Sequence, residues 1–387
     1  MRVLFLNHNV IGSGTFSRAF NLARQLVVRG HQVTLVTTSR SSRLRVCTRP
    51  HDGVDVIEAP DLFSGRARTG WDPYNTWRRT RLVSRRTYDI VHAFDSRPAV
   101  IYPALRATAD NHALFVMDWA DWWGRGGWIY DRSGWLVRTT FGPIEGWFEE
   151  AYRTRASGMT VASQALGERT ASLGIARERI EVLPGGCEPV PEVETRAEAR
   201  ARLGVEADTP VILHVGVLTP GDAEFLLAAF GKVQREIPKA TLVLAGRTGM
   251  RVAARNGAGA IHVTGPIDET TLRNWLAAAT VCVVPCRDTV GNRGRWPSKV
   301  NEYLASGRAI VMPRVSDAAT LIESAAAGWV TAPTIDAFAA GIANALTTPS
   351  GADGAGARGR ELAAGELAWP RIADRLVAFY KRVSVSQ

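Results

Sequence analysis

The stretch RGRWPSKVNEYLASGRAIV, from Arg293 to Val311, decides the fold and lies in the second half of the chain. Its Pro-Ser pair predicts a helix start, because the missing N–H of proline would have no partner in a first turn anyway. Ser298, or the residue before it, can cap that end. Gly307 predicts the end of the helix, because glycine readily adopts a left-handed C-terminal cap. Ile310 and Val311 then predict a buried strand.

The start of this helix gathers Arg293, Arg295 and Lys299, which makes it a candidate anion site. Glu302 and Tyr303 follow Lys299 on the helix surface, and Glu302 can accept hydrogen bonds from hydroxyl groups. A phosphate beside a diol describes a nucleotide sugar. An ordinary amphipathic helix with a solvated basic start fits this stretch equally well.

Length and charge narrow the classes of protein. A chain of 387 residues usually forms two domains, and 46% hydrophobic residues supply enough core for a globular enzyme. The formal net charge of +10 favours phosphorylated ligands, anionic lipid surfaces or nucleic acid. No basic run is interleaved with aromatic residues in the manner of nucleic-acid-binding proteins, so we expect no nucleic-acid partner.

The cysteines and the apolar runs indicate the compartment. The four cysteines are scattered, which argues against a disulfide framework and a zinc site and suits a reducing cytosol. The N-terminus enters a strand directly, and no apolar run approaches membrane-spanning length. We expect a cytoplasmic protein without a metal or cofactor, either soluble or peripheral to the inner face of the membrane.

The N-terminal segment predicts one βαβ unit. VLFLN, the turn HNVIGSGT, a helix from Phe16 to Arg29 and the strand QVTLVT follow one another. Gly12 and Gly14 in that turn let a backbone approach a phosphate or a sugar, although a tight turn alone also explains them. No acidic residue ends the second strand, so a nicotinamide cofactor is disfavoured.

Polar residues follow the next two strands. His92 ends YDIVHAF, Asp95 and Arg97 come just beyond, and Asp118 and Asp121 follow the strand from Leu114 to Met117. Ligands bind at the carboxyl ends of strands in open parallel sheets, so His92, Asp95 and Asp118 are candidate catalytic residues, with Asp118 the better base. A structural role for His92 stays open.

Six of the 12 tryptophans lie between residues 119 and 147. Aromatic residues flanked by Gly and Arg can stack on sugar rings or lie at a membrane interface; a bulky local core is the alternative. Trp119, Asp121 and Trp122 are the candidate acceptor-binding residues.

The rest of the chain predicts a second series of strands and helices. The Pro- and acid-rich segment 188–198 marks a domain junction, and alternating elements resume at Thr209. We expect residues 40–86 to be irregular, residues 143–155 to be helical, the Gly/Ala-rich residues 350–359 to be flexible, and Leu367 to Val383 to form the last helix. The fold class is α/β, with two doubly wound Rossmann-like domains.

The order and spacing of several segments resemble the family 4 glycosyltransferases of GT-B fold over essentially the whole chain. The segments are IGSGTFSRAFNLARQLVVRGHQVTLVT, YDIVHAF, HVGVL, LVLAGR, VTGPI, VCVVP, KVNEYLASGRAIV and LAWPRIADRLVAFY. The resemblance implies two domains facing each other across a cleft: an acceptor-binding domain of residues 1–188, joined by the terminal helix 371–387, and a nucleotide-sugar-binding domain of residues 189–370.

The resemblance also implies the chemistry. It implies metal-independent transfer of a sugar from a nucleotide diphosphate donor to an acceptor hydroxyl, usually with retention, and it matches Glu302 to a glutamate that holds ribose hydroxyls. Three departures stand out: Gly294 replaces the first glutamate of that pair, no Arg or Lys follows Gly216, and Phe94 replaces a histidine. Our hypothesis is that Lys299, with Arg293 or Arg295, neutralises the diphosphate. The predicted donor-binding residues are Gly12, Gly14, Gly216, Arg247, Arg293, Ser298, Lys299 and Glu302.

Two other functions remain open at this point. A non-catalytic subunit could keep the fold without the missing cations, and a sugar-nucleotide epimerase would need no acceptor. The acceptor itself is not identified: a lipid-linked sugar, a polysaccharide end and a small molecule all fit.

Overall fold

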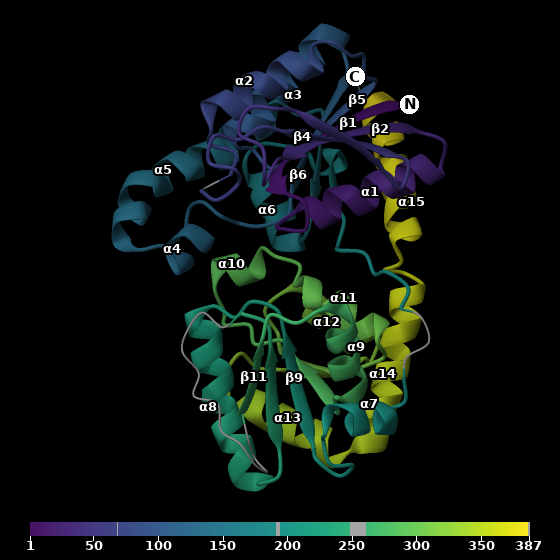
Figure 1. The fold of residues 1–387 in the computed structure, drawn as a ribbon. Helices are drawn as coiled ribbons and strands as arrows, with labels where there is room; N and C mark the ends of the chain where they lie inside the picture. The colour runs from purple at the N-terminus through teal and green to yellow at the C-terminus, as the bar shows by residue number, and fades with distance from the viewer. Residues whose placement is uncertain (68, 191–193, 248–260, 386–387) are drawn as a thin grey trace. The chain divides into compact units, whose positions relative to one another are not determined.

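The computed structural model describes residues 1–67, 69–190, 194–247 and 261–385. Two compact units make up the chain: unit 1 contains residues 1–184 and 369–387, and unit 2 contains residues 185–368. Each unit is a parallel sheet with helices packed against it, as the strands and helices of Figure 1 show. The predicted pair of doubly wound α/β domains is confirmed.

Unit 1 has an eight-stranded sheet in the order β3-β4-β2-β1-β5-β6-β7-β8, parallel except for the edge pair β3 and β4. Its strands are β1 (Arg2–Val10), β2 (Gln32–Thr38), β3 (Cys47–His51), β4 (Val54–Ala59), β5 (Ile90–Phe94), β6 (Leu114–Trp119), β7 (Gly158–Val161) and β8 (Ile180–Val182). The central strands are buried along their length, as the continuous apolar runs in VLFLN and IVHAF require.

The helices of unit 1 connect these strands. They are α1 (Phe16–Val28), α2 (Pro73–Val83), α3 (Pro98–Asn111), α4 (Trp128–Arg132), α5 (Trp135–Ala151), α6 (Gln164–Ser172) and the C-terminal α15 (Trp369–Val385), with short 3-10 turns at Arg153–Arg155 and Arg177–Arg179. Helix α15 belongs to unit 1 because its apolar face, with Ile372, Leu376 and Phe379, is buried in the core that α1 and β1 share.

Unit 2 has a six-stranded parallel sheet in the order β11-β10-β9-β12-β13-β14. Its strands are β9 (Val211–Val215), β10 (Thr241–Ala245), β11 (Ile261–Gly265), β12 (Val281–Val283), β13 (Ile310–Pro313) and β14 (Gly328–Thr331). Its helices are α7 (Arg196–Leu203), α8 (Pro220–Glu236), α9 (Glu269–Ala278), α10 (Val290–Arg293), α11 (Ser298–Ala305), α12 (Asp317–Ser324), α13 (Ile335–Thr347) and α14 (Pro349–Ala364).

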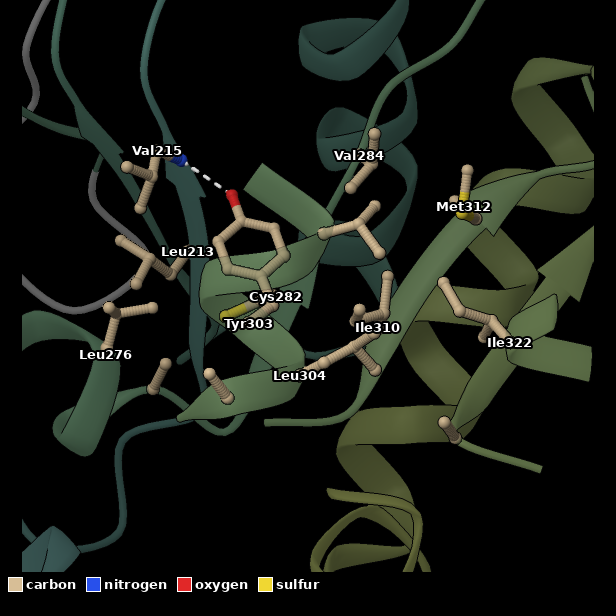
Figure 2. Close-up of a cluster of buried hydrophobic side chains, with 14 of the residues drawn as sticks. Leu213, Val215, Leu276, Cys282, Val284, Tyr303, Leu304, Ile310, Met312 and Ile322 are labelled. Carbon is tan, nitrogen blue, oxygen red and sulfur yellow. Dashed lines mark hydrogen bonds between the residues drawn. The ribbon is translucent and has the colours of Figure 1, made fainter. Parts of the chain in front are cut away.

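The stretch 293–311 lies at the centre of unit 2. Helix α11 ends at Gly307, whose φ of 64° is the left-handed cap expected of it. Tyr303 points into the core rather than along the helix surface, and its hydroxyl accepts a hydrogen bond of 2.8 Å from the backbone N–H of Val215 (Figure 2). Of the two predicted cap positions, Ser298 and the residue before it, the N-cap of α11 is Pro297, and no side-chain hydrogen bond caps that end.

Two expectations about local structure are wrong, and a third is confirmed in part. Residues 40–86 contain β3, β4 and α2. The helix expected at 143–155 is confirmed as far as Ala151, as part of α5, which begins earlier, at Trp135. Residues 350–359 lie inside α14. Its glycines permit close packing: a Cβ on Gly356 would lie 2.1 Å from the carbonyl oxygen of Gly307. Glycine here marks a helix contact, whereas the composition suggested a flexible segment.

The units divide a few residues from the predicted boundaries of 188/189 and 370/371. Gly186 and Cys187 already belong to unit 2, because the side-chain amide of Asn301 donates to the Gly186 carbonyl and the Cys187 N–H donates to Leu367. Within the described residues, no helix is both long enough and apolar enough to span a membrane.

Candidate functional site

A pocket of about 260 Å³ opens in unit 1 at the carboxyl ends of β1, β5 and β6. This is the edge of a parallel sheet where ligands usually bind. The residues that line it come from the strand ends and the loops after them: His8, Asn9, Gly14, Thr15, Ala67, Thr69, Asp95, Arg97, Asp118, Trp119, Ala120, Asp121, Trp123 and Arg153.

The turn between β1 and α1 supplies one wall of this pocket. The side-chain oxygen of Asn9 accepts hydrogen bonds from both the backbone N–H and the hydroxyl of Thr15. Gly14 has a φ of 54°, and a Cβ there would lie 2.5 Å from the Asn9 side chain, so the turn requires a glycine. Gly14 lines the pocket, whereas Gly12 is exposed and does not.

His8 and Asp95 are in contact in the pocket, with 2.6 Å between Nε2 and Oδ2. Asp95 adopts a φ of 93°, which is rare for a residue with a side chain. Nδ1 of His8 lies 3.4 Å from a guanidinium N–H of Arg97. Because arginine can only donate, Nδ1 accepts and Nε2 carries the proton given to Asp95.

Electrostatics keep this pair as neutral imidazole and carboxylate. Burial and the nearby Arg97 lower the pKa of His8, against the pull of Asp95. Burial alone would raise the pKa of Asp95, but His8 and Arg97 outweigh it and hold that pKa well below its usual range. Asp95 therefore offers an ionised oxygen to the pocket and is suited to accept hydrogen bonds from hydroxyl groups.

Arg97 and Glu145 form a buried ion pair behind Asp95, at 2.7 Å. The Arg97 guanidinium also donates to the carbonyl of Thr69 at 2.9 Å and lies 3.9 Å from Asp95. Helix α5 supplies Glu145, so this pair ties the helix to the pocket. The guanidinium is already surrounded by acceptors on the protein itself.

Asp118 lines the pocket but is held by partners. Its side chain is 1% exposed, receives hydrogen bonds from the Arg18 guanidinium and lies 2.6 Å from the donating hydroxyl of Thr160. Thr160 in turn contacts Nε2 of His92, whose Nδ1 lies 2.7 Å from the Tyr380 hydroxyl. Burial lowers the pKa of His92 to about 3, and His92 is fully buried and does not line the pocket. The structure gives His92 a supporting place beneath Asp118.

Glu149 anchors the tryptophan-rich loop after β6. Its carboxylate accepts hydrogen bonds from the Trp119 indole N–H and from the backbone N–H groups of Trp123 and Gly124. Burial raises the pKa of Glu149 to about 7, although Arg153 and the two backbone N–H groups oppose that rise. The Arg153 guanidinium lies 3.8 Å from the centre of the Trp119 ring.

Of the predicted acceptor-binding residues, Trp119 and Asp121 line the pocket, and Trp122 packs beside Trp119 outside it. The sequence analysis missed Trp123 and His8. Trp123 was hidden among neighbouring tryptophans, but His8 carried a usable signal, because it lies at the carboxyl end of the first strand, next to Asn9 and the glycine turn.

Unit 2 gathers its charges at the carboxyl ends of β9 and β12. Nζ of Lys299, on the first turn of α11, lies 2.5 Å from Nε2 of the buried His214 on β9. Burial and then Arg295 lower the pKa of Lys299 to about 7, against two carboxylates and a thiol that would raise it. Burial and Lys299 lower the pKa of His214 well below its ordinary value. Lys299 and His214 can therefore take up a further proton when an anion binds beside them.

A second cation lies at the start of α8. Arg287 contacts Asp222, and a Cβ on Gly221 would lie 2.3 Å from its guanidinium. Arg287 therefore covers the segment after β9 that carries no Arg or Lys of its own. The sequence analysis missed this residue, although its place after the strand VCVVP could have indicated it.

The other predicted donor residues differ in their surroundings. Glu302 is exposed on α11, and Gly216 has a φ of 92° after β9. Arg293 forms a two-contact ion pair with Asp288, at 2.6 and 2.8 Å. Arg247 and Ser298 are exposed. Within the described parts of the chain, no three His, Cys, Asp or Glu side chains are grouped to hold a metal ion.

Two family models match the chain, one in each unit. Residues 12–189 match "Glycosyltransferase Family 4", and residues 209–348 match "Glycosyl transferases group 1". Together they cover most of both units. No curated protein sequence matched the chain.

Solved structures with the same fold are distant in sequence. A sucrose-phosphate synthase from Thermosynechococcus elongatus has a TM-score of 0.74 at 17% identity, with 100% of each chain covered. WaaG, a glycosyltransferase of lipopolysaccharide biosynthesis, has a TM-score of 0.64 at 17% identity, covering 96% of this chain and 98% of WaaG. HepE from Anabaena, in complex with UDP-glucose, has a TM-score of 0.68 at 15% identity, covering 98% and 99%.

The structural matches cover both α/β units, and the two family models divide between them. The chain thus belongs to the group 1 and family 4 glycosyltransferases and has the GT-B fold.

Proposed function

We propose that this enzyme transfers a sugar from a nucleotide diphosphate sugar to an acceptor hydroxyl, without a metal ion and with retention, in the synthesis of a glycan, glycolipid or natural product. Unit 2 binds the donor, and unit 1 binds the acceptor. The observation that carries the proposal is the cluster of Arg295, just before α11, with Lys299 and Glu302 on α11, which gathers cations and a carboxylate at the start of one helix.

The unit 2 cluster suits a leaving diphosphate. Arg295 is half-buried and lies close enough to Lys299 to lower its pKa. Arg287 adds a cation at the start of α8, where no lysine or arginine follows Gly216. Cationic side chains and helix N–H groups can stabilise the negative charge that develops as the sugar departs. Glu302 is exposed one turn further along α11, in reach of ribose hydroxyls.

The unit 1 pocket suits a neutral, hydroxyl-bearing acceptor. Asp95, Asp118 and Asp121 line it, together with Arg97 and Arg153. Arg97 is bound by Glu145, and Arg153 donates to the carbonyls of Glu149 and Asp118. The arginines are therefore engaged, while Asp95 offers an ionised hydrogen-bond acceptor and Trp123 an aromatic surface, both of which sugars use. All four cysteines are free thiols, which supports a cytoplasmic enzyme.

The donor is the first property to test, with UDP-glucose, UDP-galactose, UDP-N-acetylglucosamine and GDP-mannose compared by thermal shift. Because HepE was crystallised with UDP-glucose, UDP sugars are the first choice. We expect donors with one of the two nucleotide bases, uracil or guanine, to raise the melting temperature of the protein by several degrees at saturating concentration. Glu302→Gln is expected to weaken binding of the free nucleoside diphosphate about tenfold, because one charged ribose contact is lost.

Turnover then separates the functions. Release of the nucleoside diphosphate that depends on an acceptor, with the sugar appearing on that acceptor, is the expected result. A donor that stabilises the protein but is never consumed would indicate a binding subunit. A donor whose sugar changes configuration without any acceptor would indicate an epimerase. Full activity after treatment with a chelator is expected, and a lasting requirement for Mg²⁺ or Mn²⁺ would contradict the metal-independent part.

A further inference from the structure

Helix α5 places two carboxylates inward and several large apolar side chains outward. Glu145 and Glu149 are buried, at 3% and 4% exposure, whereas Leu136, Ile144 and Trp147 are 59%, 44% and 53% exposed. A surface helix of a globular protein normally has the opposite arrangement, with its apolar face toward the core. The arrangement of α5 requires an explanation on both sides.

The inward side is explained by the unit 1 pocket. Glu145 pairs with Arg97, and Glu149 accepts the backbone N–H groups of Trp123 and Gly124. These two carboxylates lie four residues apart and so share one face of the helix. Nothing in that role requires large apolar side chains on the opposite face.

The outward side forms a continuous apolar surface along the helix. Ile144 and Trp147 follow Leu136 by eight and eleven positions, so the three side chains lie on one side of α5. The first two turns, residues 135–140, are exposed all around, and Trp135 is 69% exposed. Helices α4 and α5 lie together at an edge of unit 1 (Figure 1). We define the α4–α5 face by its exposed apolar residues: Tyr130, Trp135, Leu136, Val137, Ile144 and Trp147.

The charges around this face favour an anionic occupant. Arg138 is the exposed ionisable residue within α5. Arg125, just before α4, has a side chain that is 68% exposed and lies 3.3 Å from the carboxylate of Glu150. One exposed carboxylate, Asp131, lies on α4. The whole chain carries a formal net charge of +10. A second copy of this basic chain would be repelled at such a surface, whereas an anionic bilayer would be attracted.

The residue types fit the boundary of a bilayer. Tryptophan and tyrosine prefer the level of the lipid headgroups, where the ring is apolar and its N–H or O–H reaches water. Leucine, valine and isoleucine reach slightly deeper, and arginine extends toward phosphate. We propose that the α4–α5 face binds an anionic lipid surface.

This contact has a consequence for the pocket. The same helix that lies on the lipid holds Arg97 and the Trp123 loop from its inner side, so a lipid-linked acceptor would meet the pocket at the membrane surface. That consequence rests on the proposed function, whereas the lipid contact itself does not.

The test is flotation of the full chain with vesicles, which needs neither donor nor turnover. We expect binding to vesicles of phosphatidylcholine with 30% phosphatidylglycerol (about that fraction supplies an anionic surface) and several-fold weaker binding to phosphatidylcholine alone. The triple variant Trp135→Ser/Leu136→Ser/Trp147→Ser is expected to lose about tenfold or more in partitioning, because three large apolar side chains leave the lipid. Arg138→Glu is expected to weaken binding to the anionic vesicles only.

The matched control is Trp77→Ser. Trp77 is 48% exposed on α2, and its ring contacts Tyr74 and Arg81 of the same helix. It is expected to float like the unchanged protein. Circular dichroism confirms that each variant is folded.

Three results would overturn the proposal: no flotation of the unchanged protein with either vesicle, equal flotation of the triple variant, or a dimer in light scattering that the triple variant converts to monomers without any lipid binding. The last result would assign the face to a second copy of the chain. Loss of turnover with flotation intact would bear only on the proposed function.

Discussion

Nζ of Lys299 lies 2.5 Å from Nε2 of His214, with His214 buried and Lys299 half-buried. If Lys299 and His214 were protonated at the same time, their positive charges would repel each other strongly at this distance. Nδ1 of His214 is buried and has no hydrogen-bond partner among the described residues. A proton on Nδ1 would therefore have no acceptor to stabilise it. The pKa of Lys299 falls to about 7 in this setting, so near neutral pH the proton on the lysine depends on what is bound.

Donor binding is therefore expected to depend on pH. An approaching diphosphate raises the pKa of Lys299 above about 7, so the complex holds a proton that the free enzyme has partly lost. The affinity for a UDP sugar should be constant below pH 7 and fall by up to about tenfold per pH unit above it. Calorimetry in buffers of different ionisation enthalpy should show proton uptake on binding at pH 7.5.

Lys299→Arg is the matched variant for this dependence, because an arginine stays charged over the whole range. It should bind the donor with an affinity that changes little between pH 6.5 and pH 8.5. Equal pH profiles for the unchanged protein and this variant would contradict the role of Lys299.

The cations of unit 2 are expected to differ in importance. Lys299→Ala and Arg295→Ala should each lower turnover about a hundredfold, because each removes a positive charge that faces the leaving diphosphate. Arg293→Ala should stay within about threefold, because Arg293 is exposed and already bound by Asp288. Steady-state rates at saturating donor measure the difference. Our hypothesis would be wrong if Lys299→Ala also stayed within a few-fold.

The sequence predicted the elements that bear strong local signals. Gly307, with its left-handed φ, ends α11 as expected, and the buried strands β1 and β5 follow from their continuous apolar runs. The segment 350–359 was misread because glycine composition suggests flexibility, and only the tertiary contact of Gly356 with Gly307 shows why a helix needs glycine there. Short exposed strands such as β3 carry almost no pattern.

The candidate site could be predicted only in part, for the same reason. Asp95 follows β5, and Asp118 and Trp119 are the last two residues of β6, so the rule of strand ends located them at the pocket. The partners of those residues are remote in sequence: Arg18 lies 100 residues from Asp118 and His8 lies on β1. No spacing rule pairs such residues, and the burial that turns His92 into a supporting residue is a property of the folded sheet.

Two glycines of α14 provide a matched test of packing. A Cβ on Gly356 would lie 2.1 Å from the Gly307 carbonyl oxygen, whereas one on Gly354 would meet only a guanidinium nitrogen of Arg358 at 3.5 Å. Gly356→Ala is expected to lower the free energy of unfolding by about 2 kcal/mol or more through overpacking. Gly354→Ala should raise it by about 0.5–1 kcal/mol, the ordinary gain of alanine inside a helix. Urea unfolding of both variants measures the contrast, and similar changes in both would contradict the close contact.

Asp95 is expected to act on the acceptor and not on the donor. Asp95→Asn keeps the size of the side chain and tolerates the positive φ, but it removes the charge that His8 and Arg97 stabilise. We expect kcat/KM for the acceptor to fall about tenfold or more, because an ionised hydrogen-bond acceptor for the hydroxyl is lost. The thermal shift with donor should be unchanged, and Asp110→Asn, on the exposed end of α3, should leave both readings unchanged. A weaker donor shift in Asp95→Asn would place Asp95 with the donor instead.

Acid should destabilise the protein through His92. The pKa of this histidine is about 3 in the folded chain, and an unfolded histidine has a pKa of about 6.5. The unfolded chain therefore binds more protons between these values, so this residue's contribution to stability is complete above about pH 6.5 and falls by about 1.4 kcal/mol per pH unit below it. Burial also lowers the pKa values of His8 and His214, so each adds to the slope of stability against pH.

Urea unfolding at pH 7, 6 and 5 should show a smaller loss of stability for His92→Asn than for the unchanged protein, whatever its absolute stability, because the substituted side chain cannot take up a proton. The control is His51→Gln, whose side chain is 63% exposed and should leave the slope as it was. The same slope in His92→Asn would mean that His92 is protonated in the folded chain, with Nδ1 donating to the Tyr380 hydroxyl.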